Sequence, residues 1–118
     1  MPSPDPQLSA IQKHYCSVTE ALSASEPIIK EFDKEFDKAV RNRQKPFGGE
    51  FGRLVAIHTK GKEGLERLKA LSEQDHGKGE HLVKALEAII AKLYADIKTI
   101  EARLFQRMAK EGRLHLPH

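Results

Sequence analysis

The sequence contains one cysteine, no tryptophan and no long apolar run, and each scarcity excludes a class of protein. Cys16 has no second cysteine to pair with, so an internal disulfide framework is excluded, and one thiol supports no thiolate metal cluster. A reducing compartment suits such a chain, and we predict a cytoplasmic location. No wholly apolar run is longer than that of Ala88 to Ala91, which is far too short to span a bilayer.

The start of the sequence is also short of apolar residues. The first residues lack the charged segment and apolar stretch of an export signal. Three of the six prolines fall in residues 1–6, so we predict a short flexible arm there, with Asp5 capping a helix that begins at Pro6. Residues 112–118 are expected to form a C-terminal tail. With 118 residues and 39% hydrophobic content, residues 1–118 are predicted to be a single helical domain.

The two-residue alternation of strands is also missing, whereas helical spacing is plain between Glu80 and Lys110. No proline or glycine interrupts this segment, which predicts one long helix. Its apolar residues recur every three or four positions: Leu82, Leu86, Ile89, Leu93, Ile97, Ile100, Leu104 and Met108. Leu82, Leu93 and Leu104 recur every eleven residues, so we expect a nearly straight helix with little left-handed supercoiling.

Two shorter helices are predicted near the N-terminus. The first begins after the arm and has the seam Leu8, Ile11, Tyr15, Val18 and Leu22. Pro27 is expected to end it and to open the second helix; one long helix kinked at Pro27 is the alternative. The second helix is predicted to bury Ile28, Ile29, Phe32, Phe36, Ala39 and Val40. Its tandem EFDK repeat, residues 31–38, aligns the two phenylalanines, and its charges are expected to be solvated.

A third helix is predicted over about Phe51 to Ser72, between a glycine-rich connection at residues 44–52 and a polar turn at residues 73–79. Its expected inward residues are Phe51, Leu54, Val55, His58, Leu65, Leu68 and Leu71. Gly61 and Gly64 either permit close approach of a neighbouring helix or leave a shallow notch. The predicted fold is all-α: an antiparallel four-helix bundle, or a long helical hairpin braced by two shorter helices.

Catalytic and metal chemistry are not indicated. The six histidines lack metal-ligand spacing, since His14 and Cys16 point to different sides of a helix and His76 and His81 straddle a turn. No serine or cysteine has a histidine at a spacing that implies a nucleophile and its base. We therefore predict no metal site, no cofactor and no enzymatic activity.

His58 is followed by Thr59, Lys60 and Gly61, and this stretch resembles the phosphoacceptor segment of histidine phosphotransfer (HPt) domains, which are all-helical and of this size. That family has lysine and glycine three and four residues after the histidine; here Gly61 and Lys62 occupy those positions in the reverse order. The resemblance, limited to residues 58–64, implies phosphorylation of His58, with Lys62 neutralising the phosphate.

The position of His58 within the helix favours a different role. It lies four residues after Leu54 and seven before Leu65, so it points toward the apolar stripe. We therefore predict a structural histidine at the edge of the core.

Basic character is concentrated in the middle of the chain. Residues 41–70 carry eight lysines and arginines against three glutamates. An anion-binding surface would use Arg41, Arg43, Lys45, Arg53, Lys60 and Lys62. Nucleic acid is a weakly supported partner, because stacking aromatics are missing among these residues.

The long apolar stripe favours a non-enzymatic interaction or scaffold module that binds a protein partner or self-associates through the last helix. That helix is predicted to extend beyond the third one, leaving apolar residues that need a cover. Either Phe47 and Phe51 of the glycine-rich connection cover them, or these residues form a dimer or partner surface. The candidate partner-binding residues are Phe47, Phe51, Leu104, Phe105 and Met108. Histidine phosphotransfer through His58 and binding of an anionic polymer through residues 41–69 are the alternatives.

Overall fold

The computed structural model describes residues 6–42 and 49–110. They form four helical segments: α1 (Pro6–Ser23), α2 (Ser25–Arg41), α3 (Gly49–Gln74) and α4 (Glu80–Lys110). No strand occurs in these two ranges, so the predicted all-α class is confirmed there. The predicted bounds of α4 and the helix start at Pro6 are also confirmed. The first five residues of the predicted arm, including the Asp5 cap, and the tail at residues 112–118 lie outside the described ranges.

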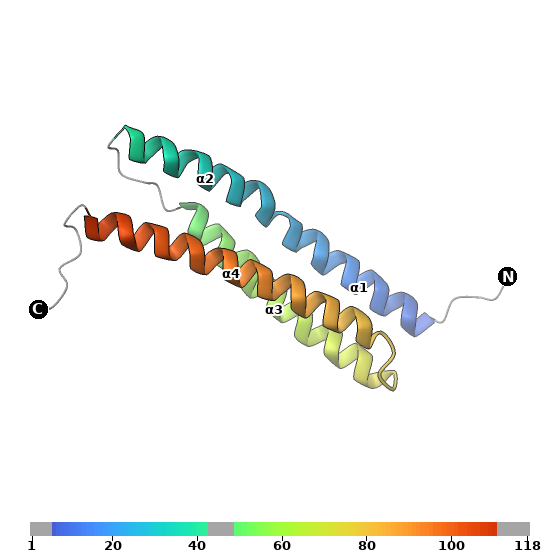
Figure 1. The fold of residues 1–118 in the computed structure, drawn as a ribbon. Helices are drawn as coiled ribbons and strands as arrows, with labels where there is room; N and C mark the ends of the chain where they lie inside the picture. The colour runs from blue at the N-terminus through green and yellow to red at the C-terminus, as the bar shows by residue number, and fades with distance from the viewer. Residues whose placement is uncertain (1–5, 43–48, 111–118) are drawn as a thin grey trace, which may run out of the picture.

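The four segments make three rods (Figure 1), because α1 and α2 follow one another end to end. α3 runs back along this combined rod, and α4 returns in the direction of α1 and α2. Residues 75–79 make the turn between α3 and α4. The described residues therefore place three rods side by side, with α3 antiparallel to the other two.

The break between α1 and α2 falls at Ala24, earlier than the predicted break at Pro27. Proline has no amide hydrogen and its ring crowds the carbonyl four residues earlier, which here belongs to Ser23. The disturbance therefore precedes the proline itself. Ala24 keeps right-handed helical angles, with φ −61° and ψ −16°, so the chain continues in nearly the same direction.

The core runs along all three rods. Its buried members are Ile11, Val18, Leu22, Phe32, Leu54, Leu65, Leu68, Val83, Leu86, Ile90, Leu93, Ile97 and Ile100. The predicted seams of α1 and α2 are confirmed at Ile11, Val18, Leu22 and Phe32. Val40 and Val55, both expected to point inward, are exposed, since Val40 lies near the end of α2 and Val55 lies on the outer side of α3.

The buried stripe of α4 differs from the predicted one. Ile90 is buried and Ile89 is exposed, and Val83 is more buried than Leu82. The buried positions 83, 86, 90, 93, 97 and 100 alternate steps of three and four, which is heptad spacing. The buried positions therefore follow heptad spacing instead of the expected eleven-residue repeat, although Leu82 and Leu104 still pack against the edge of the core. The predicted straightness of the helix stays a prediction. Two adjacent isoleucines both satisfied the spacing, and packing against the other rods selects Ile90.

Close packing of α1 on α3 explains the two glycines in the middle of α3. A Cβ on Gly61 would lie 2.6 Å from Cδ2 of Leu22, and one on Gly64 would lie 2.6 Å from Cγ2 of Val18. Nε2 of His14 also lies 2.9 Å from the carbonyl oxygen of Gly64. Of the two alternatives, close helix approach is confirmed.

The predicted polar turn closes α3 with a Schellman-type cap. The amide of Gly77 donates to the carbonyl of Ser72 at 2.8 Å, and the amide of His76 donates to Glu73 at 3.2 Å. His76 has a φ of 55°, the left-handed conformation that this cap requires, and Gly77 after it has a φ of 83°. At its other end α3 begins at Gly49, so Gly49 and Gly52, which were assigned to the connection, belong to the start of this helix; Gly48 lies outside the described ranges.

Candidate functional site

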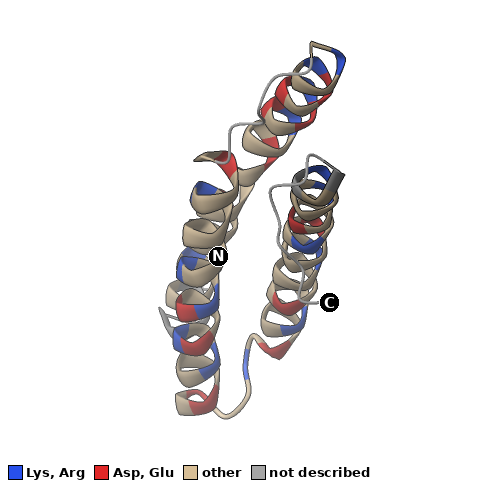
Figure 2. Ribbon diagram, turned by 90° about the vertical axis from the view of Figure 1, so that its left-hand side faces the viewer, with Lys and Arg blue, Asp and Glu red and all other residues tan. Residues whose placement is uncertain are grey.

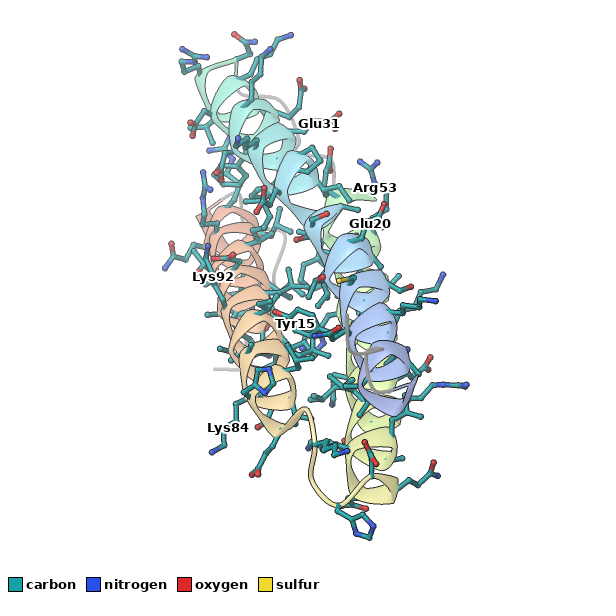
Figure 3. The ribbon with its side chains drawn as sticks, turned by 90° about the vertical axis from the view of Figure 1, so that its right-hand side faces the viewer. Tyr15, Glu20, Glu31, Arg53, Lys84 and Lys92 are labelled. Carbon is teal, nitrogen blue, oxygen red and sulfur yellow. The ribbon has the colours of Figure 1, made fainter. Side chains whose placement is uncertain are left out.

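Two ion pairs between helices show which residues of α2, α3 and α4 lie side by side near the start of α3. Glu31 on α2 lies 3.9 Å from Arg53 on α3, and these two side chains approach one another in Figure 3. Asp37 on α2 lies 3.4 Å from Arg103 on α4. Since α3 begins only at Gly49, α2 and α4 continue beyond it as a pair (Figure 1). Among the described residues, the bundle therefore has two rods instead of three at this end.

A groove of 720 Å³ opens where α2 and α4 extend past α3. We call it the distal groove; its lining residues are Phe36, Val40, Arg103, Phe105, Gln106, Arg107 and Ala109. Phe105 is 49% exposed and Val40 is 38% exposed, which makes them two of the large apolar side chains that the described surface leaves in water. The groove thus combines an exposed apolar lining with two guanidinium groups.

Arg103 joins the two walls of the groove. Its guanidinium lies 4.5 Å from the ring centroid of Phe36 and 5.4 Å from that of Phe32. It also donates hydrogen bonds to Asp33 and Asp37. The two phenylalanines occupy equivalent positions of the tandem repeat in α2, and so do the two aspartates. Both copies of the repeat therefore contact the side chain of Arg103. Both aspartates are exposed, as the sequence predicted, and they also pair with Arg103 across the helices.

Three of the five predicted partner-binding residues have described side chains, and these three lie in two environments. Phe51 and Leu104 are half-buried and pack against the core, so they are not open surface. Phe105 lines the distal groove. Met108 belongs to α4, but its side chain is not described, and Phe47 lies outside the described ranges.

Phe36, Val40 and Ala109 were not predicted as groove residues. The greater length of α4 predicted that it extends past α3, whereas Phe36 and Val40 of the second helix were predicted to be buried. Helical spacing within α2 contains no information about which helix lies beside its end.

The structure does not gather the predicted anion-binding residues on one face. At 100° per residue, Lys60 shares a side of α3 with Arg53, whereas Lys62 lies about 180° around the helix from Arg53. Arg53 is also paired with Glu31. Figure 2 shows acidic and basic residues interspersed along the helices, and in Figure 3 Lys84 and Lys92 project from the outer side of α4. Arg41 ends α2, and Arg43 and Lys45 lie outside the described ranges.

His58 lies at the edge of the α3–α4 interface, as its position in the helix predicted. Its ring is half-buried and lies 5.6 Å, centroid to centroid, from the ring of Tyr94 on α4. Burial is the main cause that lowers the pKa of His58 below 6.5, and the positive charge of Lys62 lowers it further. Thr59, Lys62, Glu63 and Glu66 line a shallow hollow beside it.

The described residues offer little reactive chemistry. Nowhere among residues 6–42 and 49–110 do three histidine, cysteine or carboxylate side chains converge in a way that would hold a metal ion. Cys16 is a free, exposed thiol. The polar residues of the distal groove, Arg103, Gln106 and Arg107, include neither a nucleophile nor a general base. Within the same ranges, no helix has an apolar stretch long enough to cross a membrane.

Similarity to known proteins does not assign a ligand to the groove. A function for the chain therefore has to follow from the chemistry of its own residues. No protein-family model matches the chain, and no curated protein or solved structure is significantly similar to it.

Proposed function

We propose that this protein is a non-enzymatic helical interaction module that binds a helix of a protein partner, or a second copy of itself, in the distal groove. One observation carries the proposal. Within residues 6–42 and 49–110, no third rod accompanies the ends of α2 and α4, and the apolar side chains of Phe36, Val40 and Phe105 line the space. The finer architecture that fits this role is a long α3–α4 hairpin braced by α1 and α2.

The energetics of apolar surface favour a macromolecular partner. Burying apolar side chains contributes roughly 25 cal/mol for each Å² removed from water, so side chains such as Phe105 and Val40 gain from being covered. Exposed apolar clusters rimmed by polar residues are typical of protein–protein contacts, and grooves between helices commonly accept an amphipathic helix. A cytoplasmic location is part of the proposal, because the exposed thiol of Cys16 suits a reducing compartment.

The test uses a fluorescent helical peptide with one leucine stripe and glutamine at its flanking positions, so that its flanks carry no charge. Its binding to the full chain is measured by anisotropy, and self-association of the chain is followed by sedimentation over a wide concentration range. The variants are Val40→Ser and Phe105→Ser in the groove. Val55→Ser is the matched control, since Val40 and Val55 are both 38% exposed and only Val40 lines the groove.

We expect the peptide to bind, or the chain to self-associate, and the groove variants to weaken that association while Val55→Ser leaves it unchanged. All three variants should melt as the unmodified protein does, because each replaces an exposed side chain. A chain that neither binds the peptide nor self-associates would overturn the proposal. So would association that Val55→Ser weakens as much as the groove variants do.

Histidine phosphotransfer is a second candidate function. The observation in its favour is that His58 borders an open hollow and has Lys62 one turn further along α3. The ring of Tyr94 covers part of the imidazole, and Glu63 and Glu66 beside the hollow would repel a phosphoryl group. Incubation with a phosphorylated response regulator or a histidine kinase, followed by an assay for acid-labile phosphate on His58, decides between the two functions.

A further inference from the structure

A second cavity, of 280 Å³, lies between α4 and the junction of α1 with α2. We call it the central cavity. Glu26 and Ile29 of α2 line it, whereas Phe36 and Val40 of the same helix line the distal groove. These four positions follow one another at steps of three, seven and four residues. One face of α2 therefore borders both cavities.

On α4 the two cavities share one face as well. Ile89 and Asp96 line the central cavity, and Arg103 lines the distal groove. These three residues are spaced by seven, about two helical turns, so they lie on the same side of the helix. The central cavity and the distal groove are therefore two stretches of one seam between α2 and α4.

Arg103 closes this seam between the two cavities. Its guanidinium donates hydrogen bonds to Asp33 and Asp37, and Asp33 falls between the residues of α2 that line the central cavity and the distal groove. The guanidinium also lies 5.4 Å from the ring centroid of Phe32, which is 1% exposed. If Arg103 moved away from α2, the two cavities would join and Phe32 would lose a neighbour that covers its ring.

The polar contacts that close the seam are exposed to solvent. The side chains of Arg103, Asp33 and Asp37 are 31%, 52% and 68% exposed. Ion pairs with this exposure are weak and are screened by salt. The core residues of α3, in contrast, are Leu54, Leu65 and Leu68. Opening of the seam therefore breaks exposed contacts, while α3 keeps its place in the core.

We propose that the seam between α2 and α4 opens in solution by a movement of α2 about Ala24, and that Arg103 controls this opening. Ala24 suits a hinge, because it occupies the N-cap position of α2 and its side chain cannot cap the helix. In the open state the distal groove continues into the central cavity and Phe32 joins its lining. The opening is a property of the fold and does not rest on the proposed function, although it determines how much apolar surface a partner reaches.

The experiment measures distances between pairs of spin labels on the full chain. Cys16→Ser removes the exposed native thiol, so that only introduced cysteines are labelled. Lys34→Cys on α2 and Ala95→Cys on α4 form the pair that spans the seam. Lys13→Cys on α1 and the same Ala95→Cys form the matched reference pair. All three labelled positions are exposed, so the labels disturb no core residue.

We expect Arg103→Gln to raise the population of long Lys34–Ala95 distances roughly fivefold, the effect of losing a few exposed contacts. The Lys13–Ala95 distances should stay unchanged. High salt should act on the unmodified chain in the same direction, because it screens the ion pairs. Lys98→Gln is the control, since it removes a positive charge of α4 that is paired with Glu101 on the same helix.

A variant with both Asp33→Asn and Asp37→Asn removes the other half of the contact and should reproduce the effect of Arg103→Gln. Melting curves establish that each variant is folded, and the asparagine variant and the salt titration decide the matter if Arg103→Gln does not fold. Unchanged Lys34–Ala95 distances in these variants and at high salt would overturn the proposal. Equal lengthening of both pairs would overturn it too, because the whole bundle would then be loosening. Neither result bears on partner binding, which the peptide and sedimentation measurements test separately.

Discussion

Val18 of α1 lies against Gly64 of α3 so closely that a Cβ on the glycine would meet Cγ2 of the valine at 2.6 Å and Cγ1 at 3.0 Å. Val18 is branched at Cβ and buried, so neither methyl group can rotate out of the contact. At the neighbouring Gly61 the corresponding contact is with Cδ2 of Leu22, the end of a longer and more adaptable side chain. The two glycines therefore differ in how strictly α1 requires them.

The first prediction compares three glycine-to-alanine substitutions in α3 by urea unfolding. Gly64→Ala should lose stability, because overpacking costs about 1–3 kcal/mol and the gain in helix propensity returns about 1 kcal/mol. Gly61→Ala should lose less stability than Gly64→Ala does. Gly52→Ala is the control and should gain up to about 1 kcal/mol, since a Cβ there meets nothing within 4 Å. Equal effects at the three positions would contradict the close packing of α1.

Helix starts and stops were predictable where a local signal sets them. Pro6 begins α1 and Glu80 follows Gly79 into α4, and both boundaries agree with the sequence prediction. The buried face of α4 was not predictable in the same way, because Ile89 and Ile90 both fit steps of three and four. Only contact with the other rods distinguishes them, and helical periodicity alone contains no information about that contact.

The second prediction concerns Arg103, which stacks on Phe32 and Phe36 and binds Asp33 and Asp37. Arg103→Lys keeps the charge but loses the planar stacking and the two-pronged hydrogen bonding. We expect a loss of about 0.5–1.5 kcal/mol in the free energy of unfolding, a modest value because the side chain is partly exposed.

Lys98→Ala is the control for Arg103→Lys. Lys98 lies on the same helix, 5.4 Å above the ring of Tyr94 and 3.6 Å from Glu101, but it is more exposed and joins no second rod. Its removal should change stability by no more than about 0.5 kcal/mol. If Arg103→Lys unfolds at the same urea concentration as the unmodified protein, the contacts of Arg103 with α2 contribute nothing measurable to the free energy of unfolding.

The third prediction follows from the lowered pKa of His58. A lowered pKa means that the folded state binds fewer protons than the unfolded state. The contribution of His58 to stability is therefore complete above pH 6.5 and is lost as the pH falls from 6.5 through the folded-state pKa. The histidine resonances in a pH titration measure this pKa directly, and unfolding at several pH values measures its effect.

Two variants identify the cause of that shift. His58→Gln should remove the part of the acid sensitivity between pH 6.5 and the folded-state pKa. Lys62→Gln should move the pKa of His58 only part of the way back, because burial is the larger cause and remains. A pKa of His58 at or above 6.5 in the unmodified protein would show that the ring is not buried against Tyr94.

The distal groove was only partly predictable, because one of its walls depends on contacts between residues that are far apart in the sequence. Phe105 was identified from the excess length of α4, a property of one segment and its neighbour. The α2 wall depends on where Arg103 meets Asp33, a contact between residues 70 positions apart. The tandem repeat indicated that Phe32 and Phe36 share a face, but nothing local to it indicates that an arginine of α4 occupies that face.

The last prediction tests the buried face of α4 with aspartate at three positions. Ile90→Asp should abolish cooperative unfolding, since Ile90 is 7% exposed and an unpaired carboxylate in the core costs about 4 kcal/mol or more. Ile89→Asp should change stability by about 1 kcal/mol or less, because Ile89 is 37% exposed and an aspartate there keeps contact with water. Leu93 is buried under both the heptad and the eleven-residue pattern, so Leu93→Asp should unfold the protein in either case. Thermal melts followed by circular dichroism distinguish the two patterns: a folded Ile90→Asp beside an unfolded Ile89→Asp would restore the eleven-residue repeat and contradict the packing described here.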